Sequence, residues 1–326
     1  MAEVSVGFAA MSERFHPTEL IELCAKAEAV GFSGVMAADH FQPWVPAQGH
    51  APYIWSLLTA IASRTTGNLG PGVVCPSFRT HPAVVAQASA TVAAMFPGRH
   101  WLGLGSGEAL NEHIVGGYWP EASDRLERLW QAIEIIKKLF SGKEVKHKSE
   151  SFTLEKTRLW TLDERPPIYV SAAGPLTAKR AGREVDGIIT PGAPVEKVAQ
   201  LYARADEGAR EAGKPEPEKI LQLHLSWADD YDEALRSALV EWPNGGMKFP
   251  KNDIRSPYDF EQLAKLVRPE DFAERMLISS DPDEHRARIQ SYLDAGATRV
   301  YLHNVGRNQS QWLDVFAREV VPRLHR

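Results

Sequence analysis

Short apolar runs alternate along this chain with longer segments in which apolar residues recur every three or four positions. In the first third of the chain the short runs predict strands, at residues 4–9, 33–37, 68–75 and 101–104. The longer segments between them predict helices, at residues 18–30, 53–64 and 82–96. Pro17 and Gly31 bracket the first helix, which agrees with the preference for proline at a helix start and glycine past its end.

The rest of the chain continues this alternation. Further strands are predicted at residues 167–174, 187–190, 219–227 and 299–304. Further helices are predicted at residues 124–140, 177–181, 195–212, 231–242, 281–295 and 309–324. Residues 144–159 alternate like a β-hairpin, whereas residues 243–268 show no clear repeat and are interpreted as an inserted, lid-like segment.

Eight predicted strands that alternate with helices are typical of a (β/α)8 barrel. We therefore predict an α/β protein, a TIM barrel with insertions, in which residues 1–326 form one domain and residues 243–268 an insertion. The alternative is an open doubly wound sheet, which would carry a Gly-x-Gly-x-x-Gly turn after the first strand. Gly7 lies inside the first predicted strand and Ser12-Glu13 follow it, so the barrel is favoured.

Composition is that of an ordinary globular protein. The 326 residues are 44% hydrophobic and 24% charged, with a formal net charge of −5. Acidic and basic residues are mixed along the chain, which argues against a nucleic-acid surface or a basic membrane patch. No apolar run is long enough to cross a bilayer, and residues 1–7 lack the pattern of a secretory signal. We expect a cytoplasmic enzyme.

The sequence contains no pattern typical of a metal site or of a disulfide framework. Cys24 and Cys75 are the only cysteines, which excludes a disulfide framework and a cysteine-based metal site. The histidines are scattered singly, without the His-x-x-x-His spacing of a zinc site, so we expect no metal. Protein side chains carry no hydride chemistry by themselves, so a redox function would need a cofactor.

The predicted strand at residues 33–37 ends in the polar loop Asp39-His40-Phe41-Gln42-Pro43-Trp44. In α/β proteins this end of a strand is where chemistry is placed. A histidine there, preceded by an acid and followed four positions later by an indole, is a candidate proton acceptor beside a flat ligand. The same loop equally fits a structural role, in which Asp39 and His40 bond to their own backbone.

Other candidate residues follow other predicted strands, and a barrel would bring them together at one mouth. They are Glu13, Cys75, Glu108, Ala172, Ala173, Gly174 and Thr190. Glu108 can donate a proton if burial raises its pKa, or it can cap the helix that follows it. The small residues before the next helix can seat an anion on backbone N–H groups, or they can simply permit a tight turn.

Two motifs, Asp39-His40-Phe41-Gln42-Pro43-Trp44 and Gly107-Glu108-Ala109-Leu110-Asn111-Glu112, resemble those of the F420-dependent glucose-6-phosphate dehydrogenases. Ser12-Glu13 and Ser280-Asp281-Pro282-Asp283 support the likeness, which covers essentially the whole chain. These enzymes belong to the bacterial-luciferase-like barrel superfamily, and similar motifs occur in F420-dependent secondary alcohol dehydrogenases. The resemblance implies a (β/α)8 barrel, usually a homodimer, that uses coenzyme F420, a deazaflavin that accepts hydride at ring carbon C5.

The resemblance also implies roles for individual residues. Asp39 would hydrogen-bond the ring, and His40 would accept the substrate's hydroxyl proton as hydride leaves the same carbon. Trp44 would line the substrate side, Glu13 would position the substrate, and Glu108 would stabilise or protonate the reduced ring. The remaining implied cofactor contacts are Gly72 and Val73, where the family carries a cis non-prolyl peptide, and Cys75, Ser106, Gly107, Asn111, Ala172, Ala173 and Gly174.

The sequence departs from these relatives where they bind the sugar phosphate with a threonine, two lysines and an arginine. Thr190 and Arg275 match, whereas the lysine positions read as Ala193 and Gln262. Losing two cations removes most of the charge-assisted bonding that a phosphate dianion needs. Three other lysines can replace them only if the fold brings one to the site: Lys197, Lys248 and Lys251.

We therefore predict an F420-dependent dehydrogenase that transfers hydride from a sugar or sugar-phosphate hydroxyl, or from a secondary alcohol, to the deazaflavin. One alternative is an FMN-dependent monooxygenase or reductase of the same superfamily. A second is a barrel that binds deazaflavin without turnover, although such a binder needs none of His40, Trp44 and Glu108 as a proton relay. The expected partners are a small sugar or alcohol and a second copy of the chain, with no nucleic acid and no membrane.

Overall fold

The centre of the molecule is a sheet of parallel strands, seen in a computed structural model that describes residues 4–325. Its main strands are β1 (Ser5–Ala10), β2 (Gly34–Ala37), β3 (Asn68–Pro71), β4 (Leu102–Leu104), β7 (Ile168–Ser171), β8 (Gly187–Pro191), β9 (Glu218–Trp227) and β11 (Arg299–Asn304). They follow the order β3-β2-β1-β11-β9-β8-β7-β4, so the first strand pairs with the last.

Backbone hydrogen bonds join the two ends of this order and close the sheet on itself. The Leu69 N–H donates to the Arg99 carbonyl at 3.0 Å, and the Val74 N–H donates to the Gly103 carbonyl at 2.9 Å. The predicted (β/α)8 barrel is therefore confirmed. The third strand ends at Pro71 rather than at Cys75, and the Gly72–Val73 peptide bond that follows it is cis, as the resemblance implied.

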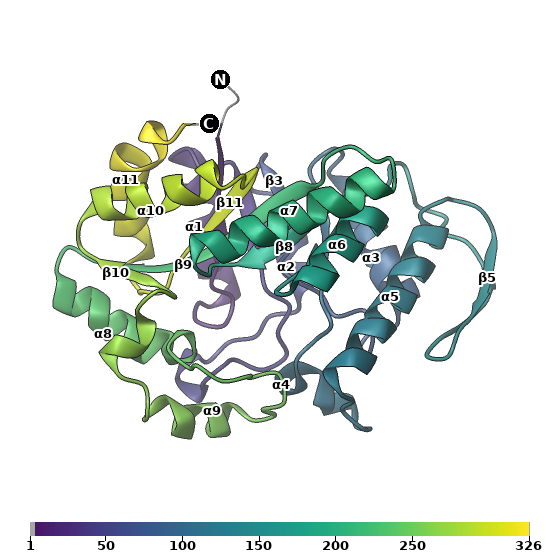
Figure 1. Cartoon of the computed structure of the whole chain (residues 1–326), viewed down its shortest axis with the longest axis horizontal. Helices are drawn as coiled ribbons and strands as arrows, with labels where there is room; N and C mark the ends of the chain where they lie inside the picture. The colour runs from purple at the N-terminus through teal and green to yellow at the C-terminus, as the bar shows by residue number, and fades with distance from the viewer. Residues whose placement is uncertain (1–3, 326) are drawn as a thin grey trace.

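Helices cover the outside of this barrel (Figure 1). They are α1 (Pro17–Ala29), α2 (Ile54–Ala62), α3 (Pro82–Met95), α5 (Ala122–Leu139), α6 (Pro175–Glu184), α7 (Val195–Glu211), α8 (Tyr231–Glu241), α10 (Pro282–Asp294) and α11 (Gln309–Glu319). Their predicted positions are confirmed, although α6 is longer than the predicted segment and α11 ends earlier. The predicted hairpin is also present, as β5 (Val145–Lys148) paired antiparallel with β6 (Thr153–Thr157).

One short strand was not predicted. β10 (Leu277–Ser279) pairs with the far end of β9, where Leu277 lies opposite Leu225. β10 can form because β9 is ten residues long, so that the carboxyl-terminal end of β9 has an edge to which another strand can pair. A strand of three residues is too short to give a readable alternation in the sequence.

The remaining short helices lie in connections. Two of them, η3 (Pro243–Gly245) and α9 (Pro257–Ala264), lie within the segment predicted as an insertion, so that segment is not free of regular structure. The others are η1 (Pro46–Gln48), α4 (Ala109–Glu112), η2 (His113–Val115), η4 (Pro269–Phe272) and η5 (Val321–Arg323). In residues 4–325 we find no helix long and apolar enough to span a membrane.

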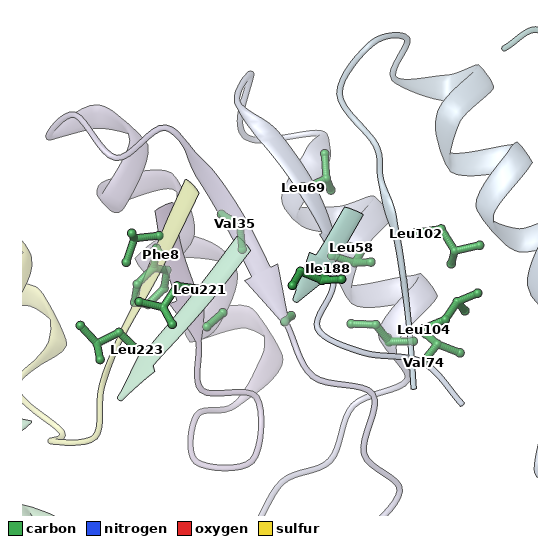
Figure 2. Close-up of a cluster of buried hydrophobic side chains, with 14 of the residues drawn as sticks. Phe8, Val35, Leu58, Leu69, Val74, Leu102, Leu104, Ile188, Leu221 and Leu223 are labelled. Atoms are coloured by element: carbon green, nitrogen blue, oxygen red, sulfur yellow. The ribbon is translucent and has the colours of Figure 1, made fainter. Parts of the chain in front are cut away.

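Alternation along the strands divides the core into two parts. One set of side chains points outward against the helices, including Phe8, Val35, Leu102, Ile188 and Leu221 (Figure 2). Their neighbours point into the barrel and form a closed layer there, made of Ala9, Met36, Trp101, Tyr169, Ile189, Ile220 and Tyr301. Because side chains alternate between the two faces, the next inward position on each strand lies two residues further on. Those positions reach the mouth of the barrel.

Candidate active site

A cavity of about 490 Å³ opens above the inner layer, at the carboxyl ends of the strands. Met36 and Ile189 of that layer form part of its floor. The walls use the next inward positions along the strands, which are Ala38, Ser171, Pro191, Gln222 and His303. The site is thus a direct consequence of strand alternation in a barrel that is packed below and open above.

Most of the predicted site residues line this one cavity. They are Glu13, Asp39, His40, Trp44, Gly72, Val73, Cys75, Ser106, Gly107, Glu108, Asn111 and Arg275. They come from segments spread over 263 positions of the chain, from Glu13 to Arg275. The residues that the predicted barrel was expected to bring together at one mouth therefore do lie together there.

Thr190 and the segment after β7 do not line the cavity. Thr190 is fully buried, with its hydroxyl 3.4 Å from both the Tyr202 hydroxyl and the Ile220 carbonyl. Its neighbours Ile189 and Pro191 face the cavity, so alternation turns Thr190 to the outside of the barrel. By the same rule Ser171 lines the cavity and Ala172 packs in the outer core, while Ala173 and Gly174 precede α6 without lining the cavity.

Glu13 and His40 form a buried ion pair. His40 Nδ1 lies 3.0 Å from Glu13 Oε1, and the two side chains are 12% and 3% exposed. Burial alone would lower the pKa of His40, but the carboxylates of Glu13, Glu108 and Asp39 outweigh it and raise that pKa to about 8. Burial likewise opposes ionisation of Glu13, yet His40 beside it holds the Glu13 pKa below its ordinary value.

Trp44 forms the wall next to His40. The two ring centroids lie 5.2 Å apart in an edge-to-face arrangement. Phe260 of α9 packs edge-to-face against the indole, with ring centroids 5.2 Å apart. The backbone N–H of Trp44 donates to Gln48 Oε1 at 2.9 Å. The inserted segment therefore fixes the position of Trp44, through Phe260.

Glu108 is a partly buried residue whose carboxyl oxygen Oε2 is buried. Burial raises its pKa above the ordinary value, although His40 and Lys251 partly oppose this. Its side chain does not cap α4, which it precedes, so the structural role considered for it does not occur. Within residues 4–325, Glu108 Oε2 is buried and has no hydrogen-bond partner. The group is suited to hold or deliver a proton inside the cavity.

Arg79, which the sequence did not reveal, organises the acids on the other side of His40. Its Nη2 atom lies 2.6 Å from Asp39 Oδ2, and its backbone N–H donates to Glu112 Oε2 at 3.0 Å. Burial raises the pKa of Asp39, and the positive charge of Arg79 partly offsets this rise. Burial also raises the pKa of Glu112, to about 7. Within the described residues, the other carboxylate oxygen, Asp39 Oδ1, is buried and has no hydrogen-bond partner.

Asn111 fixes the loop that carries His40. Its Oδ1 atom accepts hydrogen bonds from the backbone N–H groups of Phe41 at 2.9 Å and Gln42 at 3.1 Å. The Gln42 side chain in turn donates to the Leu110 carbonyl at 2.6 Å. The two motifs that resemble the F420 enzymes are therefore joined in space, and Asn111 lines the cavity while it orders the loop.

Glycines keep one wall of the cavity flat. A Cβ atom at Gly107, whose φ is +82°, would lie 2.7 Å from Cys75 Sγ, and one at Gly105 would lie 2.6 Å from Val73 Cγ2. A Cβ at Gly72 would lie 2.3 Å from Met36 Sδ. The wall built by Gly72, Val73 and residues 105–107 is therefore closely packed against the side chains of Met36, Val73 and Cys75, and its glycines add no side chain that would keep a planar ligand away.

The opposite wall carries His224, Trp242 and His303, to which the sequence gave no role, and Lys251, one of the three lysines considered from the sequence. His224 stacks on Trp242 with ring centroids 5.0 Å apart, and His303 contacts both rings at 4.7 Å. Lys251 also lines the cavity, and its Nζ atom donates to the Asn244 carbonyl at 2.6 Å. Only the alternation of β9 and β11 could have indicated the histidines, since each stands alone in its strand.

Residues 2–299 match the family model described as luciferase-like monooxygenase. The chain therefore belongs to the luciferase-like family of barrel proteins. Within that family, it belongs with the F420-dependent glucose-6-phosphate dehydrogenases. It is 37% identical over 334 residues to the Mycobacterium avium (strain 104) protein of that name, a match that covers 100% of this chain and 99% of that protein. The predicted family resemblance is confirmed.

Two further proteins extend the comparison. F420-dependent glucose-6-phosphate dehydrogenase 1 of Rhodococcus jostii (strain RHA1) is 37% identical over 329 residues, covering 98% of both chains. A solved F420-dependent secondary alcohol dehydrogenase, in complex with an F420-acetone adduct, is 31% identical with a TM-score of 0.93 over the full length of both chains. The chain is thus similar to dehydrogenases of two substrate classes.

Proposed function

We propose that this protein is an F420-dependent dehydrogenase that oxidises a hydroxyl group of a sugar, a sugar phosphate or a secondary alcohol. The observation that carries the proposal is the buried Glu13–His40 pair beside Trp44, at the mouth of a barrel similar over its full length to F420-dependent dehydrogenases. A carboxylate that orients an imidazole is a common way to build a general base.

The residues present fit the deazaflavin. The glycine wall formed by Gly72, Val73 and residues 105–107 suits a planar ring, and the buried Asp39 Oδ1 has no hydrogen-bond partner within residues 4–325. When bound, the deazaflavin supplies the hydride acceptor. We assign the ring contacts to Asp39, Gly72, Val73, Cys75, Ser106 and Asn111. We assign the phosphate-bearing tail to Gly107 and Glu108 and, outside the cavity, to Ala173 and Gly174 before α6, whereas Ala172 packs in the outer core and makes no direct contact.

We assign to His40 the role of accepting the hydroxyl proton. Because Nδ1 faces Glu13, the neutral imidazole presents Nε2 as the acceptor. As the carbon–hydrogen bond breaks and hydride leaves, the hydroxyl proton moves to Nε2 and the Glu13 carboxylate stabilises the imidazolium that forms. Glu108, with its raised pKa, exchanges a proton on the cofactor side, and Trp44 holds the substrate next to His40.

The cations of the cavity support an anionic substrate group. Lys251 and Arg275 both line the cavity, so the fold brings one of the three lysines considered from the sequence to the site. Lys248 instead pairs with Asp271 at 3.0 Å, and Lys197 on α7 does not line the cavity. We therefore propose that Lys251 and Arg275 hold the phosphate of a sugar phosphate, and that Thr190 contributes no direct contact.

Ala193 and Gln262, which stand at the expected lysine positions, make hydrogen bonds outside the cavity. The Ala193 carbonyl accepts a hydrogen bond from the Tyr292 hydroxyl at 2.6 Å. Gln262 Oε1 accepts one from Lys265 at 2.7 Å on the outer side of α9. Neither lines the cavity, so the loss of these two lysine positions does not by itself remove a cation from the site.

The family likeness also supports three wider proposals. We propose a homodimer, a cytoplasmic location and a single barrel domain over residues 1–326, of which residues 1–3 and 326 lie outside the described part. The pairing of β1 with β11 supports the single domain, because it joins the two ends of the chain in one sheet. Light scattering on the purified protein at several concentrations tests the dimer, and a constant monomer mass would overturn it.

Cofactor titration tests the central proposal. The protein is titrated separately with F420 and with FMN, and F420 absorbance is then followed with glucose 6-phosphate, glucose and propan-2-ol as substrates. We expect tighter binding of F420 and its reduction by at least one substrate. Tighter binding of FMN would favour the monooxygenase or reductase alternative. F420 binding without reduction by any substrate class would favour a non-catalytic deazaflavin-binding barrel.

A further inference from the structure

Glu241 is a buried acid at the end of α8 that the reaction described above does not use. It directly precedes Trp242, which lines the cavity, but Glu241 itself does not line it. The Glu241 side chain is 9% exposed, and its carboxylate lies 2.9 Å from Arg14 Nε and 2.5 Å from Arg307 Nε. Burial raises the pKa of Glu241, and the two guanidinium groups favour its ionised form. Because a buried ion pair adds little net stability, we ask what this one holds in place.

Arg14 joins Glu241 to the turn that carries Glu13. The Arg14 side chain is only 8% exposed, and it also donates a hydrogen bond to the Ala47 carbonyl. Arg14 directly follows Glu13 in the chain. The Glu13 side chain lines the cavity, whereas the Arg14 side chain lies outside it and reaches Glu241. The ion pair with Glu241 therefore anchors the Glu13 turn from outside the cavity.

The backbone of Glu241 anchors a second part of the site. Gln48, which is 2% exposed, donates from Nε2 to the Glu241 carbonyl at 3.0 Å. The same side chain accepts the backbone N–H of Trp44 at 2.9 Å, and the His50 N–H donates to the Glu13 carbonyl at 3.0 Å. The turn of Glu13 and the loop of Trp44 are thus both tied to one residue of α8, the first by its carboxylate and the second by its carbonyl.

The position of the Glu13 carboxylate decides the state of His40. A hydrogen bond such as the 3.0 Å contact between Glu13 and His40 is lost when its atoms separate by about 1 Å. The charged groups that act on His40 are Glu13, Glu108 and Asp39, and Glu13 also faces His303. Of the three acids around His40, Glu13 is the one whose chain neighbour is bound to Glu241.

We propose that Glu241 is a positioning residue of the candidate active site, which holds the Glu13 carboxylate against His40 through its ion pair with Arg14. This inference rests on the proposed function, to which it adds a residue outside the cavity. Glu241 acts on the proton acceptor only through Glu13, so its effect should disappear when Glu13 no longer carries a charge.

The first test measures His40 directly, by NMR titration of the histidine rings in the cofactor-free protein, with His40→Ala to assign the signal. In Glu241→Gln we expect the His40 pKa to fall below the wild-type value, because Glu13 is the acid that most raises it. With F420 and the best of glucose 6-phosphate, glucose and propan-2-ol, the rising limb of kcat/KM should move to lower pH.

Turnover of Glu241→Gln should also fall, by about tenfold. This loss is smaller than the hundredfold that a displacement of about 1 Å can cost, since His50 still holds the backbone of Glu13. The F420 dissociation constant should not change, which also shows that the variant is folded. Arg14→Met breaks the same ion pair from its other end and should give the same shifts, so it carries the test if Glu241→Gln does not fold.

Three further variants separate positioning from general stability. Glu241→Asp keeps the charge and should recover part of the turnover. The double variant Glu13→Gln/Glu241→Gln should titrate like Glu13→Gln alone, because residues that act through one contact are not additive. Asp206→Asn is the matched control, since Asp206 pairs with the buried Lys219 at 2.8 Å outside the cavity. It should lower thermal stability without changing the His40 titration.

Each outcome has a distinct meaning. An unchanged His40 pKa in folded Glu241→Gln and Arg14→Met would overturn the inference, while F420 reduction by the wild type keeps the proposed function. A further fall of the His40 pKa when Glu241→Gln is added to Glu13→Gln would also overturn it. If the wild type reduces F420 with none of the three substrates, the proposed function and the catalytic role of Glu241 fall together. The NMR titration then still decides whether Glu241 holds Glu13 against His40.

Discussion

The two walls of the cavity are built in different ways. The wall that we assign to the cofactor comes from β2, β3, β4 and the loops after them, which carry contiguous polar and glycine motifs, residues 39–44 and 105–112. The wall that we assign to the substrate comes from β9 and β11, with Gln222, His224 and His303, from Trp242 after α8, and from the inserted segment, with Asn244, Gly245, Lys251 and Asn252. The residues of the first wall are mostly contiguous in the sequence, whereas those of the second come from several separate segments.

Glu13 connects the two walls. It follows β1, which lies between β2 and β11 in the sheet. The carboxylate is therefore close enough to both His40 and His303 to shift the pKa of each. This comparison predicts that changes in the cofactor wall alter F420 binding, that changes in the substrate wall alter substrate preference, and that Glu13 and His40 alter the chemical step.

The largest expected effect is that of His40→Ala, which removes the proton acceptor between the walls. We expect turnover to fall about a hundredfold or more, the usual scale for a lost general base. F420 affinity should remain almost intact, because His40 is not part of the glycine wall. Steady-state kinetics and an F420 titration measure the two quantities. An equal loss of both would mean that His40 is mainly structural.

The next largest effect is expected for Lys251, in the wall that we assign to the substrate. Lys251→Met should raise KM for glucose 6-phosphate about ten- to a hundredfold, because a hydrogen bond between charged groups is lost in a partly buried site. KM for propan-2-ol and the F420 dissociation constant should not change. Lys248→Met is the matched control, since Lys248 pairs with Asp271 and does not line the cavity. If both variants behave alike, Lys251 does not contact the substrate.

The corresponding change in the cofactor wall is Asp39→Asn. We expect the F420 dissociation constant to rise about tenfold, since the amide keeps the shape but loses a charged acceptor that Arg79 orients. The ratio of kcat/KM for the sugar to that for propan-2-ol should stay the same. A changed ratio with unchanged F420 binding would place Asp39 on the substrate side and contradict the division of the cavity into a cofactor wall and a substrate wall.

A smaller effect is expected in the pH dependence. His40 must be neutral to accept a proton, and its pKa is raised to about 8, so the rate of alcohol oxidation should rise with pH through about 8. Glu13→Gln removes the carboxylate that most raises this pKa, so the rising limb should move to lower pH. A pH profile of kcat/KM for both proteins measures the shift. A shift in the opposite direction would exclude His40 as the titrating base.

The smallest effect is expected for Thr190→Val. Thr190 faces the outer side of the barrel and bonds weakly to Tyr202 and Ile220 at 3.4 Å. We expect kcat and KM for glucose 6-phosphate to change by less than about twofold, with a modest loss of thermal stability. A tenfold rise in KM would restore the role that the family resemblance implies for this residue.

Much of the architecture could be read from the sequence because it depends on local patterns. The alternation of apolar runs and amphipathic segments predicted the barrel, and the loop from Asp39 to Trp44 and the segment around Glu108 were found as motifs. β10 was missed because three residues that pair with the free end of β9 carry no local signal. Arg79 was missed because its partners, Asp39 and Glu112, lie far from it in the sequence.

Thr190 shows how a small difference in position decides a side chain's role. The sequence places it at the end of a strand, but a shift of one residue moves a side chain to the other face of the sheet. Only the register of β8 with its neighbours, in which Ile189 and Pro191 face inward, resolves which residue meets a ligand. The same rule brings Ser171 rather than Ala172 to the cavity.

The amino-acid sequence by itself determined the barrel, the family and the loop that holds Asp39, His40 and Trp44, because these follow from periodicity and from contiguous motifs. The tertiary structure alone decided which isolated residues share the cavity. Closing the sheet brings Glu13, His40, Lys251, Arg275 and His303 into one buried volume. The pKa shifts and ion pairs that arise there depend on burial and on neighbours remote in the sequence, which no local pattern can express.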